Sequence, residues 1–293
     1  MKKRALFLAL CLFIAVPARA FTLSNFDSPE SMIVDSQDGA YYVSNVNGAP
    51  DAKDGNGYIS KINSKGTLVI QKYIGGKPGQ PVLDAPKGMV ILGKILFVTD
   101  IDSIKGFDKE TAKLIITIDL SKAGAKFLND ITADRTGVLY ASDTLMNQIF
   151  KIDSKKNYEV SVLKTSFEIT GPNGLTINPK TKNLVVVAWQ GGEILEVTPE
   201  GKVHQLKKGL WALDGVDSDG HGNLYVSSFE KGEIYKIPYF GRGPISVFLS
   251  GLTTPADISF DWKNSELLIP SFKGNSVTTY YVKSISDAHP PKK

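Results

Sequence analysis

The chain repeats itself at an interval of about 42 residues, and this repeat restricts the fold more than any other feature of the sequence. Six segments align, each a short motif such as Pro172-Asn173-Gly174-Leu175 followed by a polar turn and a β-rich run. Their second residues are Glu30, Lys87, Asn129, Asn173, Asp214 and Ala256, separated by 57, 42, 44, 41 and 42 positions. Short strands between Gly, Asn and Asp turns at this spacing indicate four strands per repeat.

Six repeats of four strands predict an all-β, six-bladed β-propeller around a central channel. A β-sandwich has a similar density of strands but would not repeat every 42 residues. The sixth repeat supplies three strands and ends at Tyr281-Val282, so residues 21–26 are expected to add its missing outer strand and close the ring. The propeller is therefore assigned to residues 21–283, and residues 284–293 to a flexible tail.

The first 20 residues have the three parts of a secretory signal peptide. Residues 2–4 (Lys-Lys-Arg) are a basic start, residues 5–16 are an apolar run of 12, and residues 18–20 (Ala-Arg-Ala) match a cleavage site. Twelve helical residues span about 18 Å, which is too short for a hydrocarbon core of about 30 Å. We therefore predict cleavage after Ala20 and a periplasmic or secreted product without a transmembrane segment.

The distribution of charge disfavours a nucleic-acid-binding protein. The formal charge of +4 comes from 34 Lys and Arg against 30 Asp and Glu. Four of the basic residues lie in the first 20 residues, which contain no acid, so the rest of the chain is formally neutral. A nucleic-acid binder requires a clustered basic surface. The only cysteine, Cys11, lies in the predicted signal peptide, which leaves no thiol for a disulfide or a zinc site.

The aligned second residues are expected to surround one mouth of the channel, because the first strand of each propeller blade lines the axis. Glu30 and Asp214 would repel each other there unless a cation or a proton lies between them. With the amide oxygens of Asn129 and Asn173 they form an all-oxygen set, which suits Ca²⁺ or another hard divalent cation better than zinc. Alternatively, Lys87 neutralises the acids and the residues form only a hydrogen-bonded plug.

A second ring of side chains is expected around the same mouth, because the second strand of each blade returns antiparallel to that face. The ends of these strands are Asn45, Asp100, Asp143, Trp189, Ser228 and Ser271. The first four of these, together with Lys87, are the predicted rim of a ligand pocket, and Lys87 could equally pair with Asp100. Trp189 is suited to contact a ligand or to pack on the rim. No histidine is placed near the axis, so no Ser-His-Asp triad can be assembled.

Four of the motifs, in this order and at this spacing, resemble the senescence-marker-protein/gluconolactonase family, which includes the luciferin-regenerating enzymes. Diisopropyl fluorophosphatase and the paraoxonases share its six-bladed plan. The motifs are Ser28-Pro29-Glu30-Ser31, Leu128-Asn129-Asp130, Pro172-Asn173-Gly174-Leu175 and Leu213-Asp214-Gly215, and the resemblance covers residues 24–283. It implies that Glu30, Asn173 and Asp214 bind Ca²⁺, with Asn129 on the ion or beside the substrate. It also implies that Asp214 is the catalytic base or nucleophile.

The resemblance implies an exported Ca²⁺-dependent hydrolase of a small lactone or ester. Phe127 stands where the gluconolactonase pattern has an arginine, and the paraoxonase histidine has no counterpart, so sugar-acid lactones are disfavoured substrates. The alternative is a non-enzymatic propeller of the NHL type that binds a small ligand or a protein in the periplasm. Lyase or isomerase chemistry at the same metal is a third possibility that the sequence does not separate from hydrolysis.

Overall fold

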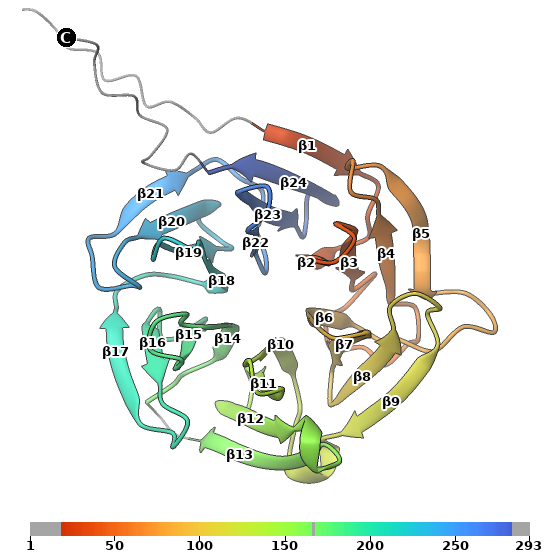
Figure 1. Ribbon diagram of the computed structural model, residues 1–293, viewed down its shortest axis with the longest axis horizontal. Coiled ribbons are helices and arrows are strands. Elements are labelled where there is room, and N and C mark those ends of the chain that lie inside the picture. The colour runs from red at the N-terminus through yellow and green to blue at the C-terminus, as the bar shows by residue number, and fades with distance from the viewer. Residues whose placement is uncertain (1–18, 166–167, 283–293) are drawn as a thin grey trace, which may run out of the picture.

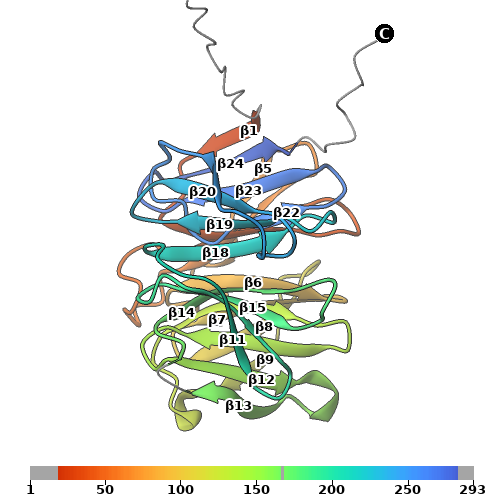
Figure 2. The ribbon, with the colours of Figure 1, turned by 90° about the vertical axis from the view of Figure 1, so that its left-hand side faces the viewer.

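The computed structural model describes residues 19–165 and 168–282, and these residues form a closed ring of six four-stranded antiparallel sheets. The six sheets are arranged like blades around a central axis, with the first strand of each blade innermost (Figure 1). Seen from the side, the ring is thinner along this axis than across it (Figure 2). The predicted six-bladed propeller is confirmed.

The strands of each blade follow one another in the chain, except in the sixth blade. Blade 1 is β2 (Pro29–Val34), β3 (Tyr41–Asn45), β4 (Tyr58–Ile62) and β5 (Leu68–Gly75), and blade 2 is β6 (Pro86–Leu92), β7 (Ile95–Asp100), β8 (Ser103–Asp108) and β9 (Leu114–Asp119). Blade 3 is β10 (Leu128–Ala133), β11 (Val138–Asp143), β12 (Gln148–Asp153) and β13 (Glu159–Thr165), and blade 4 is β14 (Pro172–Ile177), β15 (Leu184–Ala188), β16 (Ile194–Val197) and β17 (Val203–Lys207). Blade 5 is β18 (Leu213–Ser218), β19 (Leu224–Ser228), β20 (Glu233–Ile237) and β21 (Ser246–Leu249), and blade 6 is β22 (Ser259–Asp261), β23 (Glu266–Ser271), β24 (Ser276–Tyr281) and β1 (Arg19–Ser24).

The N-terminal strand β1 closes the ring by pairing with β24, as predicted. Thr22, Leu23 and Ser24 lie opposite Thr278, Val277 and Ser276. The ring of Phe21 then packs edge-on against Tyr41 of blade 1, with the ring centroids 5.6 Å apart. The strand runs from Arg19 to Ser24, whereas residues 21–26 were predicted, so its first two residues precede the predicted cleavage point after Ala20. Residues 1–18, which include most of the predicted signal peptide, and residues 283–293, which include the predicted tail, lie outside the described part of the chain.

Each of the first five blades carries a β-bulge at the start of its innermost strand. In blade 3, Leu128 pairs with Asp143 and the next pair is Ile131 with Ala141, so Asn129 and Asp130 lie in the bulge. The same shift occurs in the other four blades, between Pro29 and Met32, Pro86 and Met89, Pro172 and Leu175, and Leu213 and Val216. A bulge turns side chains away from the regular alternation of a strand. The aligned second residues of these five blades therefore lie at the same position of the same backbone bulge.

Neighbouring blades are held together by apolar side chains and, close to the axis, by hydroxyl groups. The core between blades 2 and 3, for example, includes Phe97 of β7 and Phe150 of β12, both fully buried. Ser142 of β11 accepts a hydrogen bond from Asp130 N of its own blade and donates one to Asn173 O of blade 4. Ser227 of β19 makes the equivalent pair of contacts toward blade 6. These bonds fix the bulges of adjacent blades relative to one another.

Close packing at the axis explains why three of the bulges contain glycine, namely Gly88, Gly174 and Gly215. A Cβ on Gly174 would lie 2.4 Å from Asp214 O, and one on Gly215 would lie 2.2 Å from Ile258 N. Any larger side chain would therefore push the backbones of adjacent blades apart. Two short 3₁₀ turns, Ser121–Ala123 and Ser154–Lys156, lie outside the sheets. Among the described residues, no helix has the length and apolarity needed to cross a membrane.

Candidate functional site

A cavity of about 370 Å³ opens at the end of the channel where the innermost strands begin, and we call this end the first mouth. The cavity is lined by Glu30, Pro50, Lys87, Phe127, Asn129, Thr144, Leu145, Asn173, Trp189, Gln190, Asp214, Phe229, Ala256 and Phe272. All six blades contribute to it. The structure therefore brings together the six residues that the repeat aligned, although they are up to 226 positions apart in the chain.

Four of these residues place oxygen atoms in the cavity wall without a hydrogen-bond partner. Glu30, Asn129, Asn173 and Asp214 are all buried. Within the described part of the chain, Glu30 Oε2, Asn129 Oδ1, Asn173 Oδ1 and Asp214 Oδ1 have no partner. Buried polar atoms without a partner are rare in native proteins because each costs about 1–3 kcal/mol. Four in one cavity make the first mouth the candidate site for a ligand or an ion.

The two carboxyl groups are also electrostatically unfavourable in their buried positions. Burial raises the pKa of Glu30 well above its usual value, and the nearby Asp214, Asp257 and Asp130 raise it further. Burial raises the pKa of Asp214 in the same way, with Asp257 adding to the effect. A carboxyl group of this kind is stabilised either by a proton or by a cation close to its oxygen atoms.

Lys87 lies in the cavity wall, but its ammonium group is held by other partners. Nζ donates to Pro50 O at 2.7 Å and Ala85 O at 3.1 Å, and lies 4.4 Å from the centre of the Phe127 ring. Burial lowers the pKa of Lys87 to about 8, although the charge of Glu30 opposes this change. Among the described residues, no carboxylate forms an ion pair with Lys87. Lys87 therefore anchors the loop at Pro50 and leaves the four oxygen atoms unpaired.

Three of the predicted rim residues do not line the cavity, because their side chains bind nearby backbone or other side chains. Asn45 accepts from Asp27 N and donates to Val43 O and to Ser60 Oγ. Asp100 accepts from the backbone N–H groups of residues 84 and 85 and pairs with Lys105 at 2.5 Å, not with Lys87. Asp143 accepts from the backbone N–H groups of residues 126, 127 and 146. A side-chain oxygen at the end of a strand can accept hydrogen bonds from the backbone N–H groups of the adjoining loop, and these three residues have that role.

Trp189 lines the cavity as one of three aromatic residues at equivalent places in blades 4, 5 and 6. Pro172 pairs with Ala188, so Trp189 comes one residue after β15, where Phe229 follows β19 and Phe272 follows β23. The sequence analysis took Trp189 as the last residue of the second strand of blade 4, but that residue is Ala188. It did not select Phe229 or Phe272. Their sequence signal is an aromatic residue directly after the second strand of each later repeat.

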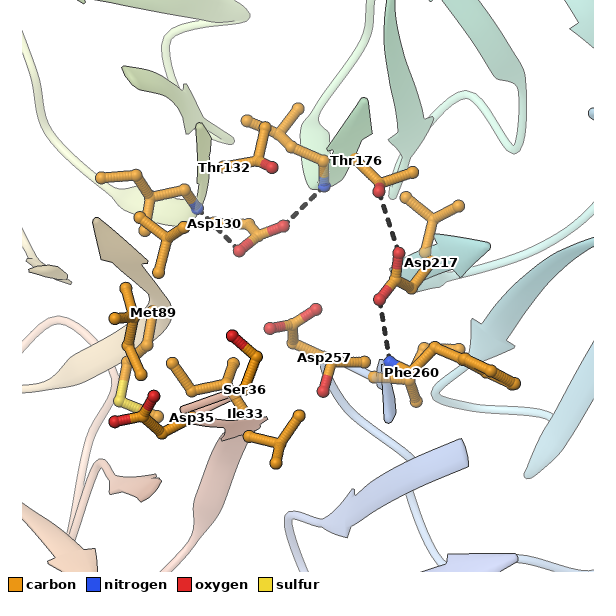
Figure 3. Close-up of a pocket in the computed structure, with 18 of the residues that line it drawn as sticks. Ile33, Asp35, Ser36, Met89, Asp130, Thr132, Thr176, Asp217, Asp257 and Phe260 are labelled. Atoms are coloured by element: carbon orange, nitrogen blue, oxygen red, sulfur yellow. Dashed lines mark hydrogen bonds between the residues drawn. The ribbon is translucent and has the colours of Figure 1, made fainter. Parts of the chain in front are cut away.

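The opposite end of the channel, which we call the second mouth, is lined by carboxylates that the repeat alignment did not select. A cavity of about 320 Å³ there includes Asp130, Asp217 and Asp257 in its wall. Asp130 accepts from Ile131 N and Leu175 N, both at 2.6 Å, and Asp257 accepts from Ser31 Oγ at 2.7 Å. Asp217 accepts from Thr176 Oγ1 and Phe260 N (Figure 3). Unlike the first mouth, this end has hydrogen-bond donors for each carboxylate.

No cluster of three or more His, Cys, Asp or Glu side chains arranged for a metal ion occurs among the described residues. A cation at the first mouth would therefore depend on the amide oxygens of Asn129 and Asn173 as well as on the two carboxylates. His204 lies on β17 and His221 in the turn after β18, and neither lines the cavity. His289 lies outside the described residues.

Comparison with known proteins supports the architecture. No protein-family model matches the chain, and no curated protein matches it. Among solved structures, a catalytically inactive variant of virginiamycin B lyase from Staphylococcus aureus with quinupristin is 16% identical, with a TM-score of 0.63 over 90% of this chain and 99% of that one. The selenomethionine-substituted enzyme is 17% identical, with a TM-score of 0.60 over 91% and 89%.

A structure of streptogramin B lyase is 15% identical, with a TM-score of 0.62 over 89% of this chain and 96% of that one. The chain shares its propeller fold with these lyases. Identities of 15–17% support the common fold alone, since one fold hosts many activities. The narrower resemblance to the gluconolactonase family remains a prediction.

Proposed function

We propose that this protein is a Ca²⁺-dependent hydrolase of a small lactone or ester, with the ion at the first mouth of the channel. The proposal depends on one observation: the oxygen atoms of Glu30, Asn129, Asn173 and Asp214 are buried in one cavity without hydrogen-bond partners. Carboxylate and amide oxygens are the donors that Ca²⁺ prefers, and water supplies the rest of its six to eight ligands. The residues present therefore fit a hard cation.

A cation bound at these four residues would polarise the carbonyl group of the substrate. Asp214 is the proposed acceptor of a proton from the attacking water, because its carboxyl group lines the cavity and has an oxygen atom without a partner. The water oxygen bonds to the carbonyl carbon, the bond from that carbon to the leaving oxygen breaks, and the proton passes to the leaving oxygen. Glu30, Asn129 and Asn173 orient the reacting groups, and the surrounding aromatic side chains limit the entry of bulk water.

We also propose that the protein is exported after cleavage of residues 1–20. The support is the basic start, the apolar run and the small-x-small site in the sequence. Expression of the full chain in a bacterium, followed by N-terminal mass analysis of the periplasmic and secreted fractions, tests this. A product that begins at Phe21 supports export, and an uncleaved product that remains with the cytoplasm contradicts it.

The test of the main proposal combines metal analysis with turnover. The purified protein should contain about one Ca²⁺ per chain, and its activity on a panel of lactones and aryl esters should be lost with EDTA and restored by Ca²⁺. Product masses separate the chemistries, because hydrolysis adds one water to the substrate whereas a lyase adds none. Activity that is insensitive to chelation, or a product with the mass of the substrate, would count against a Ca²⁺-dependent hydrolase.

A second candidate is a non-enzymatic propeller that binds a small ligand or a protein. One observation favours it: Phe127, which stands in the place of the gluconolactonase arginine, packs against Lys87 and offers no charged group to a substrate. A ligand that binds at the first mouth with a measurable affinity but is never converted would support this alternative.

A further inference from the structure

The part of the first-mouth cavity that is not occupied by the four oxygen atoms is largely aromatic. Trp189, Phe229 and Phe272 contact one another in sequence across blades 4, 5 and 6. The ring centroids of Trp189 and Phe229 are 5.4 Å apart with an interplanar angle of 61°, and those of Phe229 and Phe272 are 5.8 Å apart at 59°. The first pair packs edge-to-face and the second is tilted, and such contacts restrict the orientations of the rings. The three residues, which we call the aromatic wall, thus present a preformed apolar surface.

The aromatic wall remains accessible, unlike the equivalent positions in blades 1 and 2. There, Val46 follows β3 and Ile101 follows β7, and both are buried in a small core with Ala85. Trp189, Phe229 and Phe272 are only partly buried, and all three line the cavity. Leu145, on the blade 3 side, also lines the cavity and is 60% exposed. Blades 4, 5 and 6, which are half of the propeller, therefore offer an apolar surface to a ligand.

Few polar groups remain in this cavity for the hydroxyl groups of a sugar. Lys87 Nζ is bonded to two carbonyl groups. The Thr144 hydroxyl donates to Pro172 O and accepts from Asn129 Nδ2. Beyond the carboxyl and amide groups of Glu30, Asn129, Asn173 and Asp214, the other polar side chains in the lining are those of Gln190 and Trp189. A polyhydroxylated ligand would bury those of its hydroxyl groups that do not reach these four residues against apolar side chains, which is unfavourable.

We propose that the substrate carries an aromatic ring, fused to or substituted on the lactone or ester, which binds against the aromatic wall while its carbonyl group faces the four oxygen atoms. This proposal depends on the proposed function for the assignment of the reacting end. The cavity volume of about 370 Å³ is at the lower end of the range for small-molecule sites, so a ligand of one or two rings fills it. The substrate class is therefore an aryl lactone or aryl ester, not a sugar-acid lactone.

A binding experiment tests this preference without requiring turnover, because lactams resist hydrolysis. The protein has three tryptophans, so the double variant Trp211→Phe, Trp262→Phe retains Trp189 as a single fluorescent probe in the cavity. We expect 3,4-dihydroquinolin-2-one, in the presence of Ca²⁺, to quench this fluorescence with a Kd about tenfold lower than that of piperidin-2-one. Gluconolactam should bind more weakly than both.

The variant Phe229→Leu should reduce the difference between the aryl and the unsubstituted lactam to about threefold or less. The matched control is Phe248→Leu, because Phe248 packs against Tyr225 and does not line the cavity. This control should keep the full difference. Phe272→Leu serves as a second wall variant if Phe229→Leu does not fold, as judged by thermal melting.

Equal affinities for the two lactams, tighter binding of gluconolactam, or no binding of any of them would overturn the aromatic preference. A parallel assay of dihydrocoumarin and δ-valerolactone tests catalysis separately. If the aryl lactam binds as expected but neither lactone is hydrolysed, the hydrolase proposal fails and the aromatic ligand preference is supported. If both are hydrolysed at the same rate and the lactams bind equally, the hydrolase stands and the preference fails.

Discussion

Both mouths of the channel contain buried carboxyl groups, but the hydrogen bonding of these groups differs between the two ends. At the first mouth, Glu30 and Asp214 each have an oxygen atom without a hydrogen-bond partner. At the second mouth, Asp130 and Asp257 accept bonds from the backbone or from a serine hydroxyl. Asn129 and Asp130 are adjacent in sequence, yet they face different mouths. Buried acids alone therefore do not select the candidate site, which is distinguished by unpartnered oxygen atoms that share one cavity.

Physical chemistry explains the different roles of the two ends. A carboxylate that accepts backbone N–H groups contributes to stability, because it satisfies donors that would otherwise be unpaired. Asp130 joins blades 3 and 4 in this way through Leu175 N. A carboxylate whose oxygen atoms lack donors contributes nothing comparable to the fold. We therefore expect changes at the first mouth to affect function, and changes at the second mouth to affect stability.

The largest expected effect is a loss of activity on removing one charge at the first mouth. Asp214→Asn should reduce kcat/KM for a hydrolysed lactone about 10³-fold, because the proposed base and one anionic ligand are lost together. The same change at the second mouth, Asp130→Asn, should leave kcat/KM within about threefold. Steady-state kinetics at a saturating Ca²⁺ concentration provide the measurement. Equal losses in the two variants would mean that the mouths do not differ in function.

The adjacent residues Asn129 and Asp130 give a matched pair for stability. Asp130→Ala should lower the free energy of unfolding by about 2–4 kcal/mol, because two backbone N–H groups lose their acceptor. Asn129→Ala, measured without Ca²⁺, should cost less than about 1 kcal/mol, because only its bond to Thr144 is lost. Urea unfolding of both variants in EDTA tests this. A larger loss for Asn129→Ala would reverse the assigned roles.

The second mouth should also make stability fall as the pH rises. Burial raises the pKa of Asp217 to about 6 and that of Asp257 to about 7, from an ordinary value of 3.8. Between the ordinary and the raised pKa, the folded protein keeps a proton that the unfolded chain has lost. The free energy of unfolding therefore decreases through this pH range, by at most about 1.4 kcal/mol per pH unit for each group.

Asp257→Asn is the variant that isolates this effect, because the amide oxygen can still accept from Ser31 Oγ. Unfolding free energies measured between pH 5 and 7 should decline less steeply in the variant than in the native chain. An unchanged slope would show that Asp257 is already ionised in the folded protein.

The smallest expected effect concerns Lys87, whose charge partly opposes the rise in the pKa of Glu30 that burial causes. A positive charge near the four oxygen atoms also repels a divalent cation. Lys87→Met should therefore tighten Ca²⁺ binding about three- to fivefold, as measured by calorimetry. Weaker binding in this variant would mean that the bonds from Nζ to Pro50 O and Ala85 O are needed to shape the site.

The repeat period in the sequence determined the number of blades, the closing strand and the residues around the first mouth. This was possible because each blade is built from local hairpins, so the spacing of strands and turns along the chain is also their spacing in the ring. The channel-facing position of Glu30, Asn129, Asn173 and Asp214 followed from the same register. The periodicity does not specify which groups each of these side chains forms hydrogen bonds with.

Only the tertiary structure decided which polar groups were already satisfied. Asn45, Asp100 and Asp143 occur at strand ends that face the first mouth, but loop donors from their own blades bind them. Asp130, in the bulge of blade 3, and Asp257, in blade 6, both line the second mouth. The close approach of blades 4 to 6 brings the aromatic wall together. Hydrogen bonding and packing depend on atoms from other blades, so the order of residues in one repeat does not specify them.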